Sequence, residues 1–507
     1  MIDFIDRLLN RITMYRLVLY VLIAFVALGA IFGAVHWVPV DPTALVFSTL
    51  FLIVLSWLAN ALFAKIFDAH PNHESTYITA LILALIVPPA SPNSLAGVTF
   101  LAAAAVVGMA SKYLLAIGKK HVFNPAALAV VVTAFALGDY ASWWVGGNLP
   151  MLPFVLVGGL LVVRKIQRFD LVLPFLGAAA ISCIALSPLF DPAGTLERLA
   201  LHTPLFFFAF IMLTEPLTTP PTRSLRIAYA VLVGALYSPY IHIGPVYSIP
   251  ELALLVGNVF AYLVSPKRKY RFVLREKKAV SADIYDFSFE PVKGLSFRPG
   301  QYLEWTLAHE LIDSRGNRRY FTIASSPTEP NVRLGVRFYD NSSSFKKRML
   351  AMKPGDPIFA GQLAGDFTLP DDLSKKLVFV AGGIGITPFR SMVKHISDSG
   401  GRRDAVLLYS NRTNADISYK EIFDEAETGW GLRTVYVVTG EGEPAPAHNG
   451  VKGRIDADLI RRTVPDYRER IFYISGTEAM VSGFKKTLRE LGIPLAQIET
   501  DFFPGFL

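Results

Sequence analysis

The distribution of apolar residues divides the chain into two parts. The first part carries long apolar runs bounded by Pro, Gly, Asp or basic clusters, and the second part carries short runs. A helix needs about twenty apolar residues to cross a bilayer. We count ten candidate spans, at roughly 16–36, 44–64, 76–88, 95–115, 124–145, 151–163, 170–190, 203–214, 225–239 and 249–265. The pattern therefore predicts a polytopic α-helical membrane domain over residues 1–265.

A basic linker at 266–278 precedes a part with a different pattern. Over 279–372, short segments alternate polar and apolar residues, which indicates an antiparallel β-barrel. From 373 to 507, apolar strands alternate with helical segments, which indicates a parallel α/β sheet. The strands we expect are Ile284–Phe289, Tyr302–Leu307, Val332–Phe338, Leu377–Ala381, Ala405–Tyr409, Arg433–Val438 and Ile471–Ile474. The expected fold class is multidomain, with a membrane domain, a barrel and an α/β domain.

Two of the candidate spans are too short to cross a bilayer. The third ends at Val87-Pro88-Pro89, and the eighth ends at Thr214-Glu215-Pro216. Each is the third member of a set of five spans, so the pair fits an inverted 5+5 repeat. Corresponding breaks of this kind point to a ligand site within a membrane fold. The alternative for the second break is a plain loop that caps a helix.

Charge supports the membrane assignment. Hydrophobic residues make up 52% of the chain and charged residues 18%, which does not suit an ordinary soluble or a disordered protein. The net charge is +8, but every basic residue before Arg271 except Arg198 falls on one side of the ten-span topology. This positive-inside pattern predicts C-terminal domains on the cytoplasmic side of the cell membrane, and no nucleic-acid partner. We expect Arg16 to His36 to remain as a span, because no cleavage site follows it.

The cysteine content limits the redox chemistry. Cys183 is the only cysteine, so the chain can form neither an internal disulfide nor the ligand set of an iron–sulfur cluster. Redox chemistry then needs organic cofactors, haem or a partner's metal, and we predict no metal site in the chain. Haem is a rival, but it would require paired histidines inside helices, and the membrane-domain histidines lie in loops or at span ends.

The membrane domain carries two motifs that resemble a known family. His121-Val122-Phe123-Asn124-Pro125-Ala126-Ala127 opens the fifth span, and the Thr-Glu-Pro break continues to Thr222. With the ten-span count, they resemble the D subunit of Rnf-type complexes and the B subunit of the sodium-pumping NADH:quinone reductase. The resemblance implies bound flavin, with candidate ligands Asn124, Thr214, Glu215 and Thr218. The Ser-Gly-Ala-Thr type sequence that carries covalent FMN is missing, so non-covalent FMN or riboflavin is expected. Helix capping alone also explains Asn124-Pro125.

A second resemblance covers residues 272–507. Arg319-Tyr320-Phe321-Thr322-Ile323-Ala324-Ser325 is similar to the Arg-x-(Tyr/Phe)-(Ser/Thr)-x-x-Ser signature of the ferredoxin-NADP reductase superfamily. An Arg neutralises the FAD pyrophosphate, an aromatic ring packs on the flavin and a hydroxyl reaches its N5 edge. Arg298-Pro299-Gly300-Gln301-Tyr302 fits the same family. Ser343, Ser344 and Phe345 fit a second pyrophosphate contact.

The resemblance extends to a nicotinamide nucleotide site. Strand 378–381 runs into a glycine-rich turn and a helix, with Gly382, Gly383, Gly385, Thr387 and Pro388 as candidate ligands of NADH or NADPH. The segment with Ser475, Gly476 and Met480 resembles the family's Cys-Gly-Pro-x-x-Met, with Ser475 in place of the Cys. Arg412 is either a contact for a 2′-phosphate or a surface charge. Phe503 covers the flavin by family analogy, or simply packs on the core.

Together these features predict a membrane-bound NAD(P)H-dependent flavin oxidoreductase, with Thr322 and Ser475 nearest the hydride transfer. We expect electrons to pass from FAD to one or two flavins at the breaks, and then to a quinone or to an extracytoplasmic redox protein that bears its own flavin. The alternative is a redox-coupled ion or solute transporter with a regulatory reductase domain. The lack of charged residues inside the spans weighs against ion pumping. The oligomeric state stays open.

Overall fold

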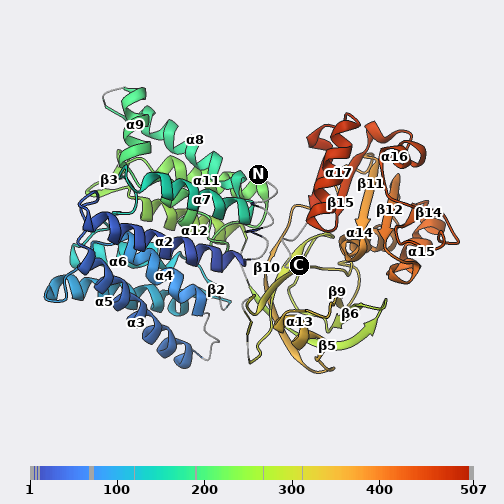
Figure 1. Cartoon of the computed structure of the whole chain (residues 1–507), viewed down its shortest axis with the longest axis horizontal. Helices are drawn as coiled ribbons and strands as arrows, with labels where there is room; N and C mark the ends of the chain where they lie inside the picture. The colour runs from blue at the N-terminus through green and yellow to red at the C-terminus, as the bar shows by residue number, and fades with distance from the viewer. Residues whose placement is uncertain are drawn as a thin grey trace. The chain divides into compact units, whose positions relative to one another are not determined.

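The structure is a computed structural model that describes residues 12–67, 73–118, 120–188, 191–265, 268–310, 312–313 and 315–501, together with Ile5, Leu8 and Leu9. The chain forms two compact units, Met1–Arg268 and Lys269–Phe506. Figure 1 shows a helical N-terminal unit in blue to green and a C-terminal unit built on two sheets in yellow to red.

The N-terminal unit is a bundle of helices with two short hairpins. Its helices are α2 (Met14–Ala34), α3 (Pro42–Ile66), α4 (His73–Ile86), α5 (Leu95–Leu114), α6 (Pro125–Leu137), α7 (Leu152–Ile166), α8 (Phe169–Leu186), α9 (Pro192–His202), α10 (Leu205–Phe207), the π-helix η1 (Phe208–Met212), α11 (Arg223–Leu236) and α12 (Pro250–Val264). The hairpins pair β1 (Ala116–Ile117) with β2 (Lys120–His121) and β3 (His242–Ile243) with β4 (Val246–Tyr247). Each predicted span therefore contains a helix.

The expectation of ten full spans is not confirmed. In the described residues, α2, α3, α5 and α8 are long and apolar enough to cross a membrane, and a fifth span results if the bent pair Pro192–His202 and Leu205–Met212 is counted as one. This pair turns by 66° beside Pro204, which lacks the N–H that a continuous helix would need. The predicted span 124–145 ends as a helix at Leu137, because Gly138 follows with φ +77°.

The loop that follows α6 closes the broken end of α4. The carbonyl of Ile86 accepts hydrogen bonds from the backbone N–H groups of Ser142 at 2.8 Å and Trp143 at 2.9 Å. The indole of Trp144 donates to the carbonyl of Ala84 at 2.8 Å. Irregular backbone within a membrane persists only where protein or water satisfies its polar groups. The proline break after α4 is thus stabilised from within the chain.

The last helices of the two predicted sets of five, α6 and α12, make related contacts. Asn124, at the start of α6, donates its side-chain N–H to Glu215, in the break after η1, at 2.9 Å. Glu251, in the first turn of α12, accepts from the indole of Trp143, in the loop that closes α4, at 2.9 Å. Each fifth helix therefore begins beside the break of the other set. An inverted repeat would produce this exchange, and the repeat itself stays a prediction.

The C-terminal unit begins with an antiparallel six-stranded sheet, which we call the barrel lobe. Its order is β8 (Arg318–Thr322), β7 (Tyr302–Thr306), β10 (Pro357–Ala364), β5 (Lys269–Ala279), β6 (Ile284–Phe289) and β9 (Val332–Arg337). Beyond β8, Ala324 donates its N–H to the carbonyl of Arg333 in β9, so the two edges meet at one end. Phe272, Trp305 and Phe345 pack in its core, and Phe345 comes from the short helix α13 (Ser344–Leu350).

The predicted basic linker 266–278 is wrong over most of its length. Residues from Lys269 onward form β5, which pairs with β10 on one side and with β6 on the other. Lys and Arg alternate here with Phe272 and Leu274, which are buried. The high charge of the segment concealed this period-two pattern, which is the one that a half-buried strand requires.

The second sheet is parallel, and we call this part the nucleotide lobe. Its order is β14 (Gly450–Lys452), β13 (Arg433–Val438), β12 (Ala405–Asn411), β11 (Leu377–Gly382), β15 (Ile471–Ser475) and β16 (Ile498–Asp501). The helices α14 (Thr387–Asp398), α15 (Lys420–Trp430), α16 (Ala457–Thr463) and α17 (Glu478–Glu490) connect its strands. All seven predicted strands are confirmed in the two sheets, to within two residues at each end.

Candidate functional site

The candidate flavin strip lies along β8 in the barrel lobe. Arg319 donates from its guanidinium to the carbonyl of Arg315 at 2.7 Å and lies 5.4 Å from the centre of the Phe345 ring. Tyr320 donates its hydroxyl to Glu304 at 3.2 Å. Thr322 ends the strand and is buried. The buried hydroxyl of Ser325 accepts from the N–H of Arg333 at 3.0 Å. The predicted residues of this motif thus share one strand and the turn that follows it.

Ser343 and Ser344 lie beside this strip at the start of α13. Ser343 caps the helix, because its hydroxyl accepts from the N–H of Lys346 at 3.3 Å. Ser344 contacts the loop between β7 and β8, where its N–H donates to Asp313 at 2.9 Å and its hydroxyl lies 2.9 Å from the ring of His309. Asp313 and His309 could not be found from sequence patterns, because Ser344 lies 31 and 35 residues away from them.

Four basic side chains lie near these serines, and their charges shift the pKa values of Lys346 and Arg319. They are Arg315, Arg319, Arg337 and Lys346. Burial, together with the charges of Arg319, Arg315 and Arg337, lowers the pKa of Lys346 to about 8. Burial and the nearby Arg315 lower the pKa of Arg319 to about 10, although Asp313 acts against the shift. A bound anion would stabilise the charged forms of Lys346 and Arg319, whose pKa values are lowered.

The glycine-rich turn joins β11 to α14 through a short 3-10 helix, η2 (Gly383–Ile386). A side chain on Gly382 would place Cβ 2.0 Å from the sulfur of Met480, and one on Gly385 would place it 2.4 Å from the carbonyl of Ser475. These glycines therefore allow protein to pack on protein, a reason that the sequence did not reveal. Gly383 has φ +52° and its Cβ position lies 3.3 Å from the guanidinium of Arg337. Thr387 bonds to Ile384, and Pro388 opens α14.

The two lobes bring three polar groups together at the carboxyl ends of β15 and β16. Ser475 ends β15 and stands opposite Asp501 in the parallel register. Asp501 forms a hydrogen bond with Thr322 of the barrel lobe. Burial raises the pKa of Asp501 to about 7, although the bond with Thr322 acts against the shift. Thr322 and Ser475 were predicted for this place, whereas Asp501 was missed because a lone Asp near the chain end has no motif.

Three further residues of this unit were predicted as nucleotide or flavin contacts: Arg412, Phe503 and Gly476. Arg412 is exposed and directly follows β12, so the structure leaves both of its interpretations open. Phe503 lies outside the described residues. Gly476 lies beside Met480, since a Cβ on Gly476 would come 2.8 Å from the Met480 sulfur.

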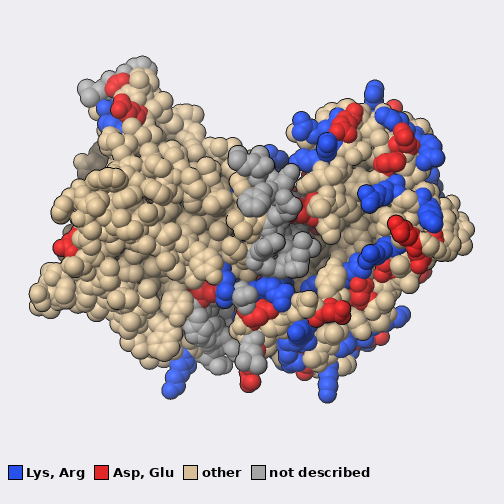
Figure 2. Space-filling model, viewed as in Figure 1, with Lys and Arg blue, Asp and Glu red and all other residues tan. Residues whose placement is uncertain are grey.

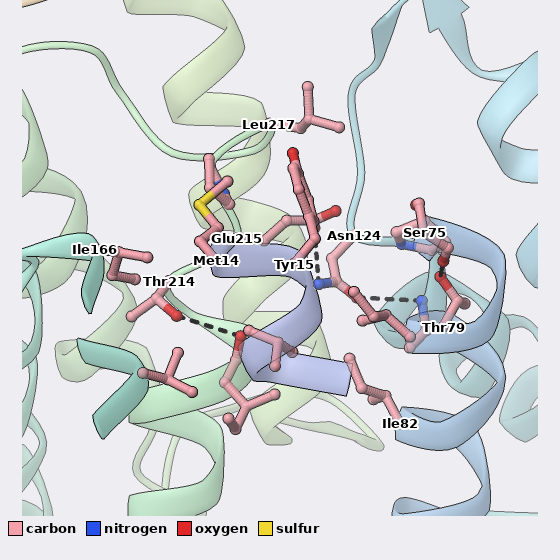
Figure 3. Close-up of a pocket in the computed structure, with 17 residues that line it drawn as sticks. Met14, Tyr15, Ser75, Thr79, Ile82, Asn124, Ile166, Thr214, Glu215 and Leu217 are labelled. Atoms are coloured by element: carbon pink, nitrogen blue, oxygen red, sulfur yellow. Dashed lines mark hydrogen bonds between the residues drawn. The ribbon is translucent and has the colours of Figure 1, made fainter. Parts of the chain in front are cut away.

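A second candidate site is a cavity in the N-terminal unit. It contains about 750 Å³ of empty space, part of it open to solvent. Figure 3 shows Asn124, Glu215 and Tyr15 lying together within it. The lining residues come from α2, α4, α6, α7 and the break after η1: Met14, Tyr15, Val18, Ser75, Ile78, Thr79, Ile82, Asn124, Pro125, Ala126, Val162, Ile166, Ile211, Thr214, Glu215, Pro216 and Leu217. Three of the four residues predicted for a membrane flavin therefore line one cavity.

Glu215 is the centre of the polar network at this cavity. One carboxylate oxygen accepts from Asn124 at 2.9 Å and from Thr218 at 3.2 Å, and the other lies 3.3 Å from the ring of His121. Lys112 interacts with Glu215 electrostatically and donates to the backbone carbonyl of Ser75 at 3.1 Å. Sequence patterns placed His121 and Lys112 only in loops or near span ends, so their convergence on Glu215 was missed.

The capping alternative for Asn124 is also correct. Its side-chain oxygen accepts from the N–H groups of Ala126 at 3.1 Å and Ala127 at 3.0 Å, while its N–H₂ group donates to Glu215. Thr214 bonds instead to the carbonyl of Phe210 within its own helical segment at 2.8 Å. Asn124 thus serves helix and cavity at once, and Thr214 contributes mainly its methyl group to the wall.

Comparison with known proteins finds similarity in the C-terminal unit. The family described as oxidoreductase NAD-binding domain matches residues 379–486. The flavohemoprotein of Pseudomonas putida is 28% identical over 239 residues, which is 46% of this chain and 59% of that protein. A glycine betaine monooxygenase reductase subunit of Chromohalobacter salexigens is 25% identical over 209 residues, 41% of this chain and 56% of that protein. The chain thus spans less than two thirds of the length of these relatives.

Among solved structures, the flavohem-like FAD/NAD binding domain of a Vibrio cholerae nitric oxide dioxygenase is similar with a TM-score of 0.41 and 21% identity, and it covers 46% of this chain and 98% of that chain. Residues 379–486 are thus similar to an oxidoreductase NAD-binding domain. The prediction of an NAD(P)H-dependent flavin oxidoreductase is confirmed at the level of enzyme class. The resemblance of the N-terminal unit to the Rnf and sodium-pumping subunits stays a prediction.

Proposed function

We propose that this chain is a membrane-bound flavoprotein that moves electrons from cytoplasmic NAD(P)H to FAD in the C-terminal unit, then to a non-covalent flavin in the cavity of the N-terminal unit. The final acceptor is a quinone of the bilayer or an extracytoplasmic redox protein. The observation that carries the proposal is the convergence of Asn124 and Glu215, from separate motifs, on one cavity.

The residues around β8 fit FAD. Arg319 and Lys346 form a cationic cluster with depressed pKa values, which matches the charge of a pyrophosphate. Tyr320, which is partly exposed, supplies aromatic surface next to it, whereas Phe345 is buried in the core beneath Arg319. When bound there, FAD accepts a hydride from the nicotinamide nucleotide and can release its electrons singly.

The chain's own groups at the hydride site bind and orient. Thr322 presents a buried hydroxyl that Asp501 holds by a hydrogen bond. Asp501 carries a proton below a pH of about 7, and so avoids placing a full negative charge where electron density increases on reduction. Ser475 lies at the end of the neighbouring strand. Correct placement of these groups accounts for the rate, because hydride transfer depends mainly on proximity and orientation.

The cavity fits an amphiphilic ring system. Its walls carry Ile78, Ile82, Val162 and Ile211, and one side carries the Asn124 and Glu215 groups. Ligand sites are commonly lined by apolar side chains with a few placed polar groups. A carboxylate favours a ligand that has an N–H to donate, as the isoalloxazine ring has, whereas a quinone offers acceptors only. This chemistry favours flavin over quinone as the occupant.

Direct transfer between the units follows from the cysteine content. With one cysteine, which is buried in α8, the chain offers no iron–sulfur relay of its own. Covalent fusion keeps the donor and acceptor sites at high effective concentration. FAD of the C-terminal unit is therefore the donor to the membrane flavin.

The test is a count of cofactors. The full chain is purified in mild detergent, denatured, and its released FAD, FMN, riboflavin and haem are quantified per chain. The proposal expects about one FAD and at least one further flavin, and NADH or NADPH should bleach both. A preparation that contains FAD alone, without a second flavin or haem, overturns the membrane step while leaving the reductase step standing.

A redox-coupled ion transporter remains the second candidate, and one observation favours it. Glu251 is 1% exposed in the first turn of α12, and Asp170 binds Arg226 at 2.7 Å where α8 and α11 begin. Buried ionisable groups in a membrane segment commonly serve ion or proton pathways. These helices contain more charge than the sequence argument assumed. Ion uptake into proteoliposomes on addition of NADH would support this candidate, and its absence under turnover would exclude it.

A further inference from the structure

A network of buried polar groups joins the two lobes of the C-terminal unit. Arg390, in α14 of the nucleotide lobe, forms two hydrogen bonds of 2.6 and 2.9 Å with Glu329 of the barrel lobe. Tyr419, which precedes α15, donates its hydroxyl to Asp286 of β6 at 2.9 Å. The Arg390 guanidinium lies 5.4 Å from the centre of the Tyr419 ring, so the two links touch. Arg390, Tyr419 and Asp286 are each at most 5% exposed.

A glycine makes the approach of the lobes possible. Gly335 of β9 stands opposite Asp286 in the antiparallel register. A Cβ at this position would lie 2.6 Å from the hydroxyl of Tyr419 and 2.7 Å from the side chain of Thr387. Tyr419 therefore passes over a strand position without a side chain to reach its partner.

The backbone of Tyr419 is in a strained conformation, which indicates that the surrounding contacts hold this residue in place. Tyr419 has φ +59° and ψ +27°, in the left-handed region that bulky residues avoid. Such a conformation is strained and persists only where the surrounding structure holds it in place. The hydrogen bond to Asp286 and the packing of the ring beneath Arg390 supply that constraint.

The network reaches both walls of the hydride site. Arg390 also donates to the carbonyl of Ala324 at 2.8 Å, and Ser391 donates to the carbonyl of Ser325 at 2.6 Å. Ala324 and Ser325 lie two and three residues after Thr322 in the flavin motif. On the other side, α14 begins at Thr387, immediately after the glycine-rich turn. Helix α14 therefore contacts the residues that follow β8 and also directly follows the glycine-rich turn.

We infer that Tyr419, Asp286, Arg390 and Glu329 form an interlobe clamp that sets the separation between flavin and nicotinamide, with Tyr419 and Asp286 as positioning residues. The inference rests on the proposed NAD(P)H–FAD reaction. Breaking one buried link lets the nucleotide lobe shift against the barrel lobe, and a displacement of about 1 Å at the reacting atoms can cost about 100-fold in rate. Nucleotide affinity changes little, because the clamp touches neither the glycine-rich turn's backbone nor Arg412.

The experiment compares Tyr419→Phe with a matched control, Tyr436→Phe. Tyr436 is a buried tyrosine of the same lobe whose hydroxyl donates to Asp424 of that lobe at 3.0 Å. Anaerobic stopped-flow reduction of FAD by NADH and NADPH gives the limiting rate and the half-saturating concentration separately. We expect Tyr419→Phe to lower the limiting rate about 10- to 100-fold and to change half-saturation less than about threefold. The charge-transfer absorbance between reduced FAD and oxidised nucleotide should weaken in parallel. Tyr436→Phe should leave both readouts unchanged.

A double-variant comparison tests the link itself. Asp286→Asn keeps an oxygen that can accept from Tyr419, so we expect a smaller loss than in Tyr419→Phe. Asp286 also accepts from Arg333 at 2.9 Å, so Asp286→Asn weakens that pair as well. The double variant should still lose less than the product of the two single losses, because the bond between Tyr419 and Asp286 is common to both changes. A limiting rate for Tyr419→Phe within twofold of the wild type, an equal loss in Tyr436→Phe, or losses that multiply in the double variant would overturn the clamp. If neither nucleotide reduces wild-type FAD, the proposed function fails instead.

Discussion

In the N-terminal unit charged side chains are few, and those that are buried lie at helix ends, as Lys165 does in the last turn of α7 and Glu251 in the first turn of α12. In the C-terminal unit they are spread over the surface (Figure 2), and some fill the interface between the lobes. A helix in a membrane satisfies its own backbone, so ionisable groups are kept only where they do work. In the C-terminal unit, by contrast, most charged side chains lie on the surface, and the buried ones mark the interface between the lobes and the candidate site.

The largest expected effect is on FAD binding in the C-terminal unit. Arg319→Ala should weaken FAD binding more than about 100-fold, because it removes a charge-assisted contact from a buried cationic cluster. FAD retained after gel filtration, together with titration of the apoprotein, measures the change. Arg433→Ala, at an exposed position that begins β13, is the matched control and should retain FAD. Equal retention by both variants would remove Arg319 from the FAD site.

The next prediction concerns the cavity of the N-terminal unit and separates the two roles of Asn124. Asn124→Ser keeps a side-chain oxygen that caps α6 but loses the N–H₂ group that holds Glu215. We expect the second flavin to bind about 10- to 100-fold more weakly, with FAD content and thermal stability close to wild type. Asp41→Ser is the control, since Asp41 caps α3 before Pro42 in the same way. A second flavin that is retained at full occupancy would contradict the role of this cavity.

A third prediction uses the depressed pKa of Lys346, which is about 8. Binding of an anion favours the protonated form, so FAD affinity should be highest below pH 8 and should fall as the pH rises through 8. The expected loss is about tenfold between pH 7 and pH 9. Lys346→Met should bind FAD weakly at both values, with the slope removed. A wild-type affinity that is constant from pH 7 to pH 9 would show that Lys346 does not face the pyrophosphate.

The smallest effect concerns Asp501, whose pKa burial raises to about 7. Below pH 7 its carboxyl is neutral, and above pH 7 it is ionised beside Thr322, where it opposes the arrival of a hydride. The rate of FAD reduction should therefore fall about three- to tenfold between pH 6 and pH 8. Asp501→Asn should keep the hydrogen bond and run at the faster rate across this range. A pH profile shared by both proteins would place the titrating group elsewhere.

Local patterns predicted the strands well, because a period-two alternation and a buried apolar run are properties of neighbouring residues. The FAD motif could be found for the same reason, since Arg319 to Ser325 lie on one strand and its turn. Asp501, Asp313 and Lys112 could not be found, because each meets its partners through pairing of distant segments. Helix lengths in the N-terminal unit were also misjudged, since Gly138 ends a helix inside the predicted span 124–145.

The bare position at Gly335 gives the chain an unusual sensitivity to a very small change. Gly335→Ala would insert a single methyl group where the opposing hydroxyl is only 2.6 Å away. The methyl group would push the nucleotide lobe away from the barrel lobe without altering any charged side chain or ligand contact. The rate of FAD reduction would then fall, while the affinities for FAD and nucleotide and the flavin absorbance would stay almost unchanged.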